Sequence, residues 1–472
     1  MIPMTLNEIA TAVSGRLVPG GDADGSSVVD GTCDTDSRNI GTGDIFFAKP
    51  GETTDGHLYA PNAVEQGAAL CVVERELDLG APQIVVDDVV LALGRLARTV
   101  VERVRANGRL RVVAVTGSNG KTTTKNLLGA IFASRGNVVA PIKSFNNEVG
   151  GPVTFLKVDD TTDTLVAEMG ASAIGEIHRL TEMARPDVGI VLGVGLAHAG
   201  EFGGIEATQR AKTEMVETLS ADGVAILNAD DPRVAAMAEH TPARIVWFGR
   251  GSKAEVRADD VSVSAAGTDF TVTVPGEEPV RVHFPVIGEH HVMNALAATA
   301  AAHVEGIPVA EVARILEGIT RAERGRMEVL VREPITVIND AYNANPDSMK
   351  AALRTLAQIA APDQRTIAVL GEMSELGELS VAEHDRLGEL AVRLGISQTV
   401  VVGEGARALY LAAVAQGSWD NEATFAATAD EAYGFLVDWM REGDLVLVKS
   451  SNSAGLIALG DRLGDYVKGL SA

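Results

Sequence analysis

The segment that most constrains the fold is a glycine-rich turn between a buried strand and a helix. Its residues are Thr116-Gly117-Ser118-Asn119-Gly120-Lys121-Thr122-Thr123. Glycines let backbone N–H groups approach phosphate oxygens, and the N-terminus of the following helix adds partial positive charge. Lys121 supplies a point charge for terminal phosphates, and Thr122 offers a hydroxyl for Mg²⁺. The segment therefore predicts a phosphate-binding strand–loop–helix unit within a parallel sheet covered by helices.

The match to a phosphate loop is to its shorter form, Gly-x-x-Gly-Lys-Thr. The longer form has glycine at the position that Val115 occupies here. A Gly-Lys-Thr turn also arises by chance, but the strand before it and the helix after it favour the functional interpretation.

The length and the change of pattern along the chain predict three α/β domains. At about 150 residues per domain, 472 residues suggest three units. We expect a small α/β domain over 1–109 and a central parallel-sheet ATPase-like domain with an antiparallel β extension over 110–320. A Rossmann-like domain is expected over 321–472, where strands again alternate with helices.

Apolar runs between turn residues predict the individual elements. Helices are expected at 89–105, 122–134 and 292–302, and antiparallel hairpins over 254–285. Buried strands are expected at 45–48, 69–73, 112–115, 164–167, 188–192, 224–227, 336–338, 366–370, 399–402 and 445–448.

Composition narrows the partners and the compartment. The net charge of −24 disfavours nucleic acid and acidic membrane surfaces, so an anionic ligand needs a local cationic site. Cys33 and Cys71 are expected to be buried thiols in a reducing compartment. The N-terminus has no basic segment before an apolar run, and no run approaches the ~18 residues of a membrane span. We expect a cytoplasmic monomer without a membrane span.

Two residues near the phosphate loop are candidate metal ligands. Glu168 ends the strand predicted at 164–167, and His198 lies just beyond the strand predicted at 188–192. Ligands of open parallel sheets bind at these carboxyl ends. Taken alone, the position of Glu168 is equally compatible with a surface carboxylate, and that of His198 with a structural histidine.

Other polar segments are open to two interpretations. Lys212 has the surroundings of a solvated helix lysine, and Asn146-Asn147 suits a turn or a cap. The segment 339–347 follows a strand and starts a helix, with Pro346 at its first turn, so it is either an elaborate cap or a binding loop.

Together these segments resemble the Mur ligase family over essentially the whole chain. The segment 288–298 is similar to the family segment whose asparagine, here Asn294, contacts adenine. Arg326 matches the arginine that approaches the phosphates of ATP, and Asp340 matches the aspartate near the ribose. The resemblance implies ATP as a cofactor, bound by Gly117, Ser118, Asn119, Gly120, Lys121, Thr122, Thr123, Asn294, Arg326 and Asp340.

The resemblance also implies a metal site and a catalytic set. Glu168, His198 and Thr122 are then Mg²⁺ ligands, and Lys212 is a carbamylated lysine that supports a second Mg²⁺. The implied catalytic residues are Lys121, Lys212, His198 and Glu168.

Within the family, the motif at 340–346 resembles that of the member that adds D-alanyl-D-alanine to a UDP-linked muramyl tripeptide. The segment 370–377 and His384 fit that member as well. The implied reaction is ATP-dependent amide formation through an acyl phosphate, with small molecules as partners. The implied contacts of the UDP-linked substrate are Ser37, Arg38, Asp55, His57, Asn146 and Asn147. Those on the dipeptide side are Tyr342, Asn343, Asn345 and Lys449.

The chain departs from the family pattern at four positions. Gly193 replaces an asparagine, and Leu196 replaces a common proline. In the segment 449–452, Ser450 replaces a glycine and Asn452 replaces an arginine, which removes a guanidinium from that loop. Three other interpretations stay open: another amide ligase of this architecture (an amino-acid-adding or folylpolyglutamate-type enzyme), a phosphate-loop ATPase, and an inactive scaffold.

Overall fold

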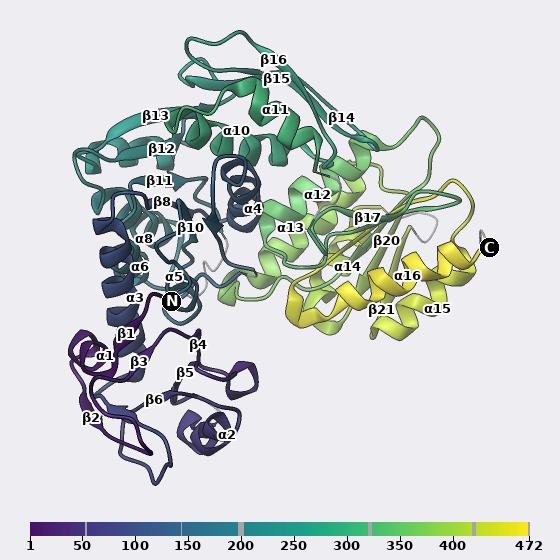
Figure 1. Ribbon diagram of the computed structural model, residues 1–472. Helices are drawn as coiled ribbons and strands as arrows, with labels where there is room; N and C mark the ends of the chain where they lie inside the picture. The colour runs from purple at the N-terminus through teal and green to yellow at the C-terminus, as the bar shows by residue number, and fades with distance from the viewer. Residues whose placement is uncertain (52–53, 143, 197–202, 320–322, 418–421, 471–472) are drawn as a thin grey trace.

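The computed structural model describes residues 1–51, 54–142, 144–196, 203–319, 323–417 and 422–470. Its strands form separate sheets in the N-terminal, central and C-terminal parts of the chain, which confirms the α/β class. In Figure 1 the N-terminal part lies below the central part, and the C-terminal part lies to the right of it. Every predicted strand is present, with bounds that differ by about a residue, as is usual at element ends.

The N-terminal part is built on a small, mainly parallel sheet in the order β2-β7-β6-β5-β4. Only the β2–β7 pair is antiparallel. Cys33 and Cys71 are both buried, as predicted. Its strands are β1 (Met4–Thr5), β2 (Arg16–Val18), β3 (Val28–Val29), β4 (Cys33–Asp34), β5 (Ile45–Phe47), β6 (Leu70–Val73) and β7 (Gln83–Val85). Its helices are α1 (Leu6–Val13), α2 (Ala60–Glu65) and the 3₁₀ turns η1 (Ser37–Asn39) and η2 (Gly56–Tyr59).

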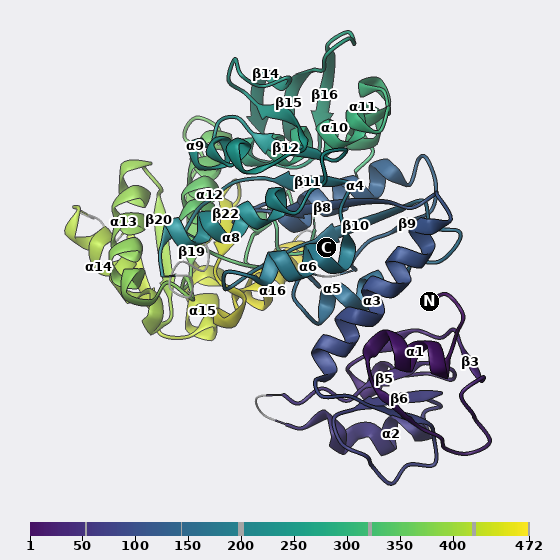
Figure 2. The ribbon, with the colours of Figure 1, turned by 90° about the vertical axis from the view of Figure 1, so that its left-hand side faces the viewer.

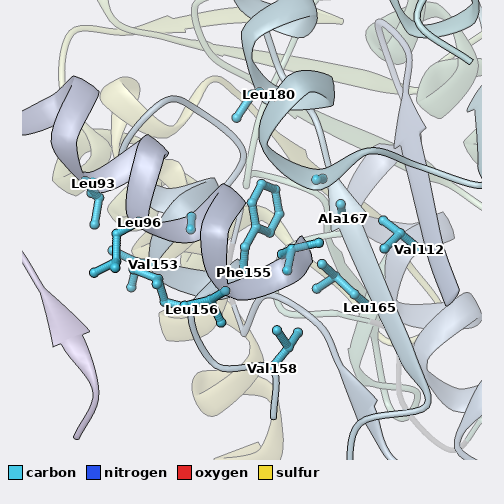
Figure 3. Packing of buried hydrophobic residues seen from close by; sticks show 14 of the residues in the cluster. Leu93, Leu96, Val112, Val153, Phe155, Leu156, Val158, Leu165, Ala167 and Leu180 are labelled. Carbon is cyan, nitrogen blue, oxygen red and sulfur yellow. The ribbon is translucent and has the colours of Figure 1, made fainter. Parts of the chain in front are cut away.

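Helix α3 (Val89–Ala106) joins the N-terminal part to the central part. It begins at Asp88, whose side chain accepts a hydrogen bond from the Leu91 N–H. Figure 3 shows its Leu93 and Leu96 beside Val153 and Leu156 of the α5 region. These residues belong to one buried cluster that continues into the central sheet, so the two parts share a core.

The central sheet has the order β16-β15-β14-β13-β12-β11-β8-β10-β9. Strands β9 to β13 run parallel, and β14 to β16 form the predicted antiparallel extension. Its strands are β8 (Arg111–Thr116), β9 (Val138–Val139), β10 (Thr164–Glu168), β11 (Val188–Val191), β12 (Val224–Asn228), β13 (Arg244–Gly249), β14 (Val256–Ser264), β15 (Gly267–Thr273) and β16 (Val280–Phe284).

Both faces of this sheet are covered by helices. Val113 and Val115 of β8 lie in the cluster with α4 and α10, whereas Val112 and Ala114 face α3 and α5. A strand buried on both faces reads as a continuous apolar run, as β8 does. The helices of the central part are α4 (Lys121–Phe132), α5 (Gly150–Phe155), α6 (Glu176–Ala184), α8 (Ile205–Glu217), α9 (Pro232–Ala236), η3 (Met237–His240), α10 (Glu289–Val304) and α11 (Val309–Glu317). Strand β13 was absent from the sequence prediction.

The C-terminal sheet has the order β17-β18-β22-β19-β20-β21, with only the β17–β18 pair antiparallel. The described helices include none long and apolar enough to cross a membrane. The strands are β17 (Glu328–Val331), β18 (Thr336–Asn339), β19 (Thr366–Leu370), β20 (Gln398–Val402), β21 (Ala423–Ala426) and β22 (Leu445–Lys449). The helices are α12 (Pro346–Ile359), η4 (Gly377–Leu379), α13 (Ser380–Arg393), η5 (Glu404–Ala406), α14 (Arg407–Ala415), α15 (Ala429–Trp439), η6 (Asn452–Ala454) and α16 (Leu456–Leu470).

The C-terminal part lies beside the central part and away from the N-terminal sheet (Figure 2). Strand β22 returns between β18 and β19, so the loops after β18 and β22 leave toward opposite faces of the sheet. Ligands of open α/β sheets bind where loops diverge in this way.

Candidate active site

The phosphate loop joins the carboxyl end of β8 to the N-terminus of α4. Gly120 has φ of +82°, a conformation that glycine adopts without strain. A Cβ at this position would lie 2.1 Å from the Asn294 Oδ1 atom, so glycine also allows α10 to approach. The Ser118 N–H donates to the Gly193 carbonyl over 2.9 Å. The loop therefore has a defined shape, and the first N–H groups of α4 point toward the space above it.

A cavity of about 430 Å³ opens above this loop, between the central and C-terminal parts. The two parts contribute residues from β-strand ends and helix starts, which brings distant segments of the sequence together. The predicted site residues that line it are Ser118, Asn119, Gly120, Lys121, Thr122, Thr123, Asn294, Arg326, Asp340, Asn343, Asn345 and Lys449.

Two lysines lie on α4, and Lys121 lines the cavity. The Lys121 Nζ atom donates to the Gly117 carbonyl over 2.8 Å, and burial lowers its pKa while Glu168 opposes that effect. Lys125 lies one turn later and is 1% exposed. Its Nζ atom donates to the Pro141 carbonyl over 2.7 Å. Sequence analysis missed Lys125, although its spacing from Lys121 places it on the same helix face.

Glu168 has the geometry of a metal ligand. It is 1% exposed, and its Oε1 atom accepts from the Thr122 hydroxyl over 3.1 Å and from the Asn146 Nδ2 atom over 2.9 Å. Its Oε2 atom is buried without a hydrogen-bond partner. A buried carboxylate oxygen with no partner is costly unless something else satisfies it, and Mg²⁺ prefers oxygen ligands. The Thr122–Glu168 pair therefore fits a divalent cation.

One predicted metal ligand is not described. His198 lies outside the described residues, so the structure does not place it. Within the described residues, no cluster of three or more histidine, cysteine, aspartate or glutamate side chains forms a metal site.

Lys212 is on α8 and is 3% exposed, so it is not the solvated lysine that its surroundings suggested. Burial, with a smaller contribution from Lys121, lowers its pKa to about 7. A large fraction of its amine is then neutral near neutral pH, which is the form that reacts with CO₂.

Replacing Lys212 by methionine is expected to remove a pH dependence of stability. Between pH 7 and 10.5 the unfolded lysine holds a proton that the folded one releases. The free energy of unfolding of the wild type therefore rises with pH across this window relative to the variant. Below pH 7 the buried ammonium destabilises the wild type fully, by a few kcal/mol. Urea unfolding in metal-free, CO₂-free buffer measures the difference. A difference that does not change with pH would contradict the shifted pKa.

The segment after β18 holds the backbone on both sides of Arg326. The Asp340 Oδ1 atom accepts from the Met327 N–H over 3.0 Å, and the Tyr342 N–H donates to the Gly325 carbonyl over 3.0 Å. The Arg326 Nη2 atom reaches across to the Thr122 hydroxyl over 3.2 Å. A guanidinium of the C-terminal part thus stands at the phosphate loop of the central part.

Lys449 is held within the C-terminal part. It is 2% exposed, and its Nζ atom lies 2.7 Å from the Asp340 Oδ2 atom. It also donates to the Asn343 carbonyl over 3.0 Å. The ammonium that was predicted on the dipeptide side therefore fixes the loop after β18. Asn452, at the start of η6, is exposed.

Helix α12 docks directly on the phosphate loop. Asn345 caps the helix through the Ser348 N–H, and its Nδ2 atom donates to the Asn119 Oδ1 atom over 2.6 Å. The Leu196 N–H donates to the Asp347 Oδ2 atom over 3.2 Å. Proline is common in the family at position 196, and proline has no N–H, so this contact depends on the departure noted in the sequence.

Asn146 and Asn147 make different contacts, and only that of Asn147 is the cap that the sequence suggested. Asn146 holds Glu168, as described above, whereas the Asn147 Oδ1 atom accepts from the Gly150 N–H over 2.9 Å and caps the start of α5. Tyr342 lies beside the cavity lining, with its hydroxyl 2.8 Å from the Ser144 Oγ atom.

The N-terminal candidates do not line this cavity. Ser37 is 6% exposed, and Arg38 is exposed and paired with Asp36. The His57 side chain is fully buried: its Nδ1 atom lies 2.6 Å from Asp55, and its Nε2 atom accepts from the Glu74 N–H. Hydrogen bonds from Arg75 and His57 hold the pKa of Asp55 well below its usual range. Asp55 and His57 order their loop.

Several residues that line the cavity were not among the predicted site residues. They are Asn228, Asp231, His290, His291, Met293, Asp347 and Ser348. Asn228 and Asp231 follow the end of β12, so the strand-end rule applied to Glu168 would have found them. Burial lowers the pKa of His290 to about 4 and also lowers the pKa of His291, so both imidazoles are neutral at pH 7.

Comparison with known families matches the same three parts of the chain. A model described as Mur ligase family, catalytic domain, matches residues 32–104. The Mur ligase middle domain matches residues 115–302, and the Mur ligase, glutamate ligase domain, matches residues 325–452.

Individual relatives match over nearly the full length. The UDP-N-acetylmuramoyl-tripeptide–D-alanyl-D-alanine ligase of Mycobacterium tuberculosis is 42% identical, with 98% of each chain covered. The enzyme of the same name from Escherichia coli is 33% identical, with 97% of each covered. A crystal structure of MurF from Acinetobacter baumannii superposes with a TM-score of 0.88 at 32% identity, covering 98% of this chain and 99% of that one. The chain belongs to the Mur ligase family.

Proposed function

We propose that this protein is an ATP-dependent ligase of peptidoglycan synthesis that joins D-alanyl-D-alanine to UDP-N-acetylmuramoyl-tripeptide. The observation that carries the proposal is the cavity in which the phosphate loop meets Arg326 and Asp340 of another domain. A two-sided site with Lys121 and Arg326 at its phosphate loop suits a nucleotide whose terminal phosphate must face a second, anionic substrate. The motif at 340–346 and relatives that carry this name over nearly their whole length support the choice of substrates.

The first chemical step transfers a phosphoryl group. A carboxylate oxygen of the tripeptide forms a bond to the γ-phosphorus of ATP, the bond to the bridging oxygen breaks, and ADP leaves. Both reactants are anionic, so the step needs local positive charge at the transferring group. Lys121, the N–H groups at the start of α4 and Arg326 supply it.

Bound Mg²⁺ supplies further charge stabilisation at the phosphates. Thr122 and Glu168 are the described residues proposed to hold it, with His198 as a third ligand. Asn146 orients Glu168 from the other side. Lys212 is proposed to react with CO₂ and to support a second Mg²⁺ as a carbamate, which its buried, easily neutralised amine favours.

The second step forms the amide. The amine nitrogen of the dipeptide attacks the acyl carbon, the carbon–oxygen bond to phosphate breaks, and the departing phosphate carries away the proton that the nitrogen loses. The acyl phosphate would hydrolyse in open water, so the walls of the cavity must exclude water. Asn343, Asn345 and Lys449 frame the C-terminal side of this space.

We assign one ligand to each of three proposed domains, whose boundaries lie near residues 109 and 320. The first domain is proposed to bind the UDP-sugar through Ser37, Arg38 and Asp55, the second ATP, and the third the dipeptide. A monomer located in the cytoplasm is proposed, since these precursors are small, water-soluble molecules.

Phosphate release tests the function directly. The protein is incubated with ATP and Mg²⁺, and the two substrates are added singly and together. We expect release only with both, and a pentapeptide product by mass. Release that ignores the dipeptide would favour an ATPase, and a better rate with a different amine would favour another ligase of the family.

A further inference from the structure

We propose that Tyr342 is a positioning residue that seats Arg326 against the nucleotide phosphates, rather than a contact of the dipeptide. The inference rests on the proposed function, because it assigns Arg326 to ATP. It concerns a side chain that sequence analysis placed on the dipeptide side.

The guanidinium of Arg326 lies over the ring of Tyr342. The Arg326 Cζ atom lies 4.4 Å from the ring centroid. A guanidinium over an aromatic face is attracted by the ring quadrupole, more strongly where water is partly excluded. The Arg326 side chain is 23% exposed, so part of this contact is shielded. Without the ring, the long arginine side chain has more rotamers to lose when ATP binds.

The hydroxyl of Tyr342 is anchored in the central part. It lies 2.8 Å from the Ser144 Oγ atom, in the same loop as Asn146, which holds Glu168. Ser144 is also 3.5 Å from the Thr122 hydroxyl, to which Arg326 donates. The ring is therefore tied to the loop beside the metal carboxylate while its face holds the phosphate-site arginine.

The backbone of Tyr342 adds a third restraint. Its N–H donates to the Gly325 carbonyl, directly before Arg326. Gly325 has φ of +69°, and a Cβ there would lie 3.1 Å from the Tyr342 nitrogen, so the two chains approach closely. Tyr342 thus contacts both the guanidinium of Arg326 and the backbone directly before it, and Arg326 covers one face of the ring. The Arg326 Nε atom also pairs with the Glu323 Oε2 atom over 3.1 Å.

Four variants separate the ring from the hydroxyl. Tyr342→Leu removes both, and Tyr342→Phe removes only the hydrogen bond to Ser144. Ser144→Ala removes that bond together with the 3.5 Å contact to the Thr122 hydroxyl, and the fourth variant combines Tyr342→Phe with Ser144→Ala. The matched control is Tyr433→Leu, because Arg462 stacks on Tyr433 at 4.2 Å in the same way, between α15 and α16 and outside the cavity. Thermal melts of all variants monitor folding.

We expect Tyr342→Leu to lower kcat/KM for ATP about threefold to thirtyfold, while KM for the dipeptide stays within about twofold. Tyr342→Phe should restore most of this loss, since it keeps the ring. Tyr342→Phe and Ser144→Ala should each lower kcat/KM for ATP by no more than about twofold, and the combined variant by no more than either one. Tyr433→Leu should behave as the wild type.

Two results would overturn the inference. One is a raised KM for the dipeptide with unchanged ATP parameters, which would make Tyr342 a dipeptide contact. The other is wild-type kinetics in Tyr342→Leu. Failure of the proposed function is a separate result, because then the wild type itself shows no dipeptide-dependent release of phosphate.

Discussion

Replacing Lys121 by methionine is expected to lower the rate of ATP-dependent amide formation by about two to three orders of magnitude. Methionine keeps the length of the side chain and removes the ammonium, which is the charge nearest the glycine turn. Its loss leaves the transferring phosphoryl group without its main point charge. Stopped-flow or coupled measurement of ADP formation at saturating substrates gives kcat directly.

A measurement of thermal stability distinguishes this loss of activity from unfolding of the variant. Burial lowers the pKa of Lys121, so the folded state carries a cost for holding the ammonium. The variant should therefore unfold at an equal or higher temperature than the wild type. Lys157→Met, at an exposed lysine of the same part of the chain, is the control and should retain activity. Full activity of the Lys121 variant would show that the phosphate loop takes no part in the mechanism.

Replacing Glu168 by glutamine is expected to lower kcat about a hundredfold or more and to raise the Mg²⁺ concentration needed for half-maximal activity. The amide keeps an oxygen that can accept from Thr122 and Asn146. It puts an NH₂ group where the carboxylate has the Oε2 atom that lacks a partner. A neutral amide is a much weaker ligand for a hard cation than a carboxylate.

Titration of activity with Mg²⁺ tests the Glu168 prediction. Glu182→Gln is the control, because Glu182 is exposed on α6 and pairs only weakly with His178. The Glu168 variant should approach the wild-type rate only at high Mg²⁺, if at all. An unchanged Mg²⁺ requirement together with a reduced rate would show that Glu168 acts on the protein scaffold instead of the metal.

The phosphate loop shows why part of the site was readable from the sequence. Its chemistry is local: a buried strand, a glycine turn and a helix start occur in consecutive residues, and each has its own pattern. The same holds for Glu168, because the end of a predicted parallel strand lies at the ligand-binding edge of a sheet. Asn294, Arg326 and Asp340 came from the family resemblance, and the structure brings all three to the cavity.

Lys212 and Lys449 show what local patterns cannot supply. Both are lysines on elements whose sequence looks unremarkable, and both are almost fully buried. Burial depends on which elements pack over a side chain, and that information lies in residues far along the chain. The low pKa of Lys212 and the ion pair of Lys449 with Asp340 follow from that packing alone.

The sequence by itself determined the α/β class, the positions of the strands that apolar runs predict, and the strand–loop–helix unit expected to bind phosphate, because these depend on neighbouring residues. Only the tertiary structure decided how the C-terminal part meets that unit. Asn345 bonds to Asn119 across 226 residues of sequence, and Arg326 to Thr122 across 204. Such contacts join polar side chains without any periodic pattern, and they exist only where the two sheets pack beside each other.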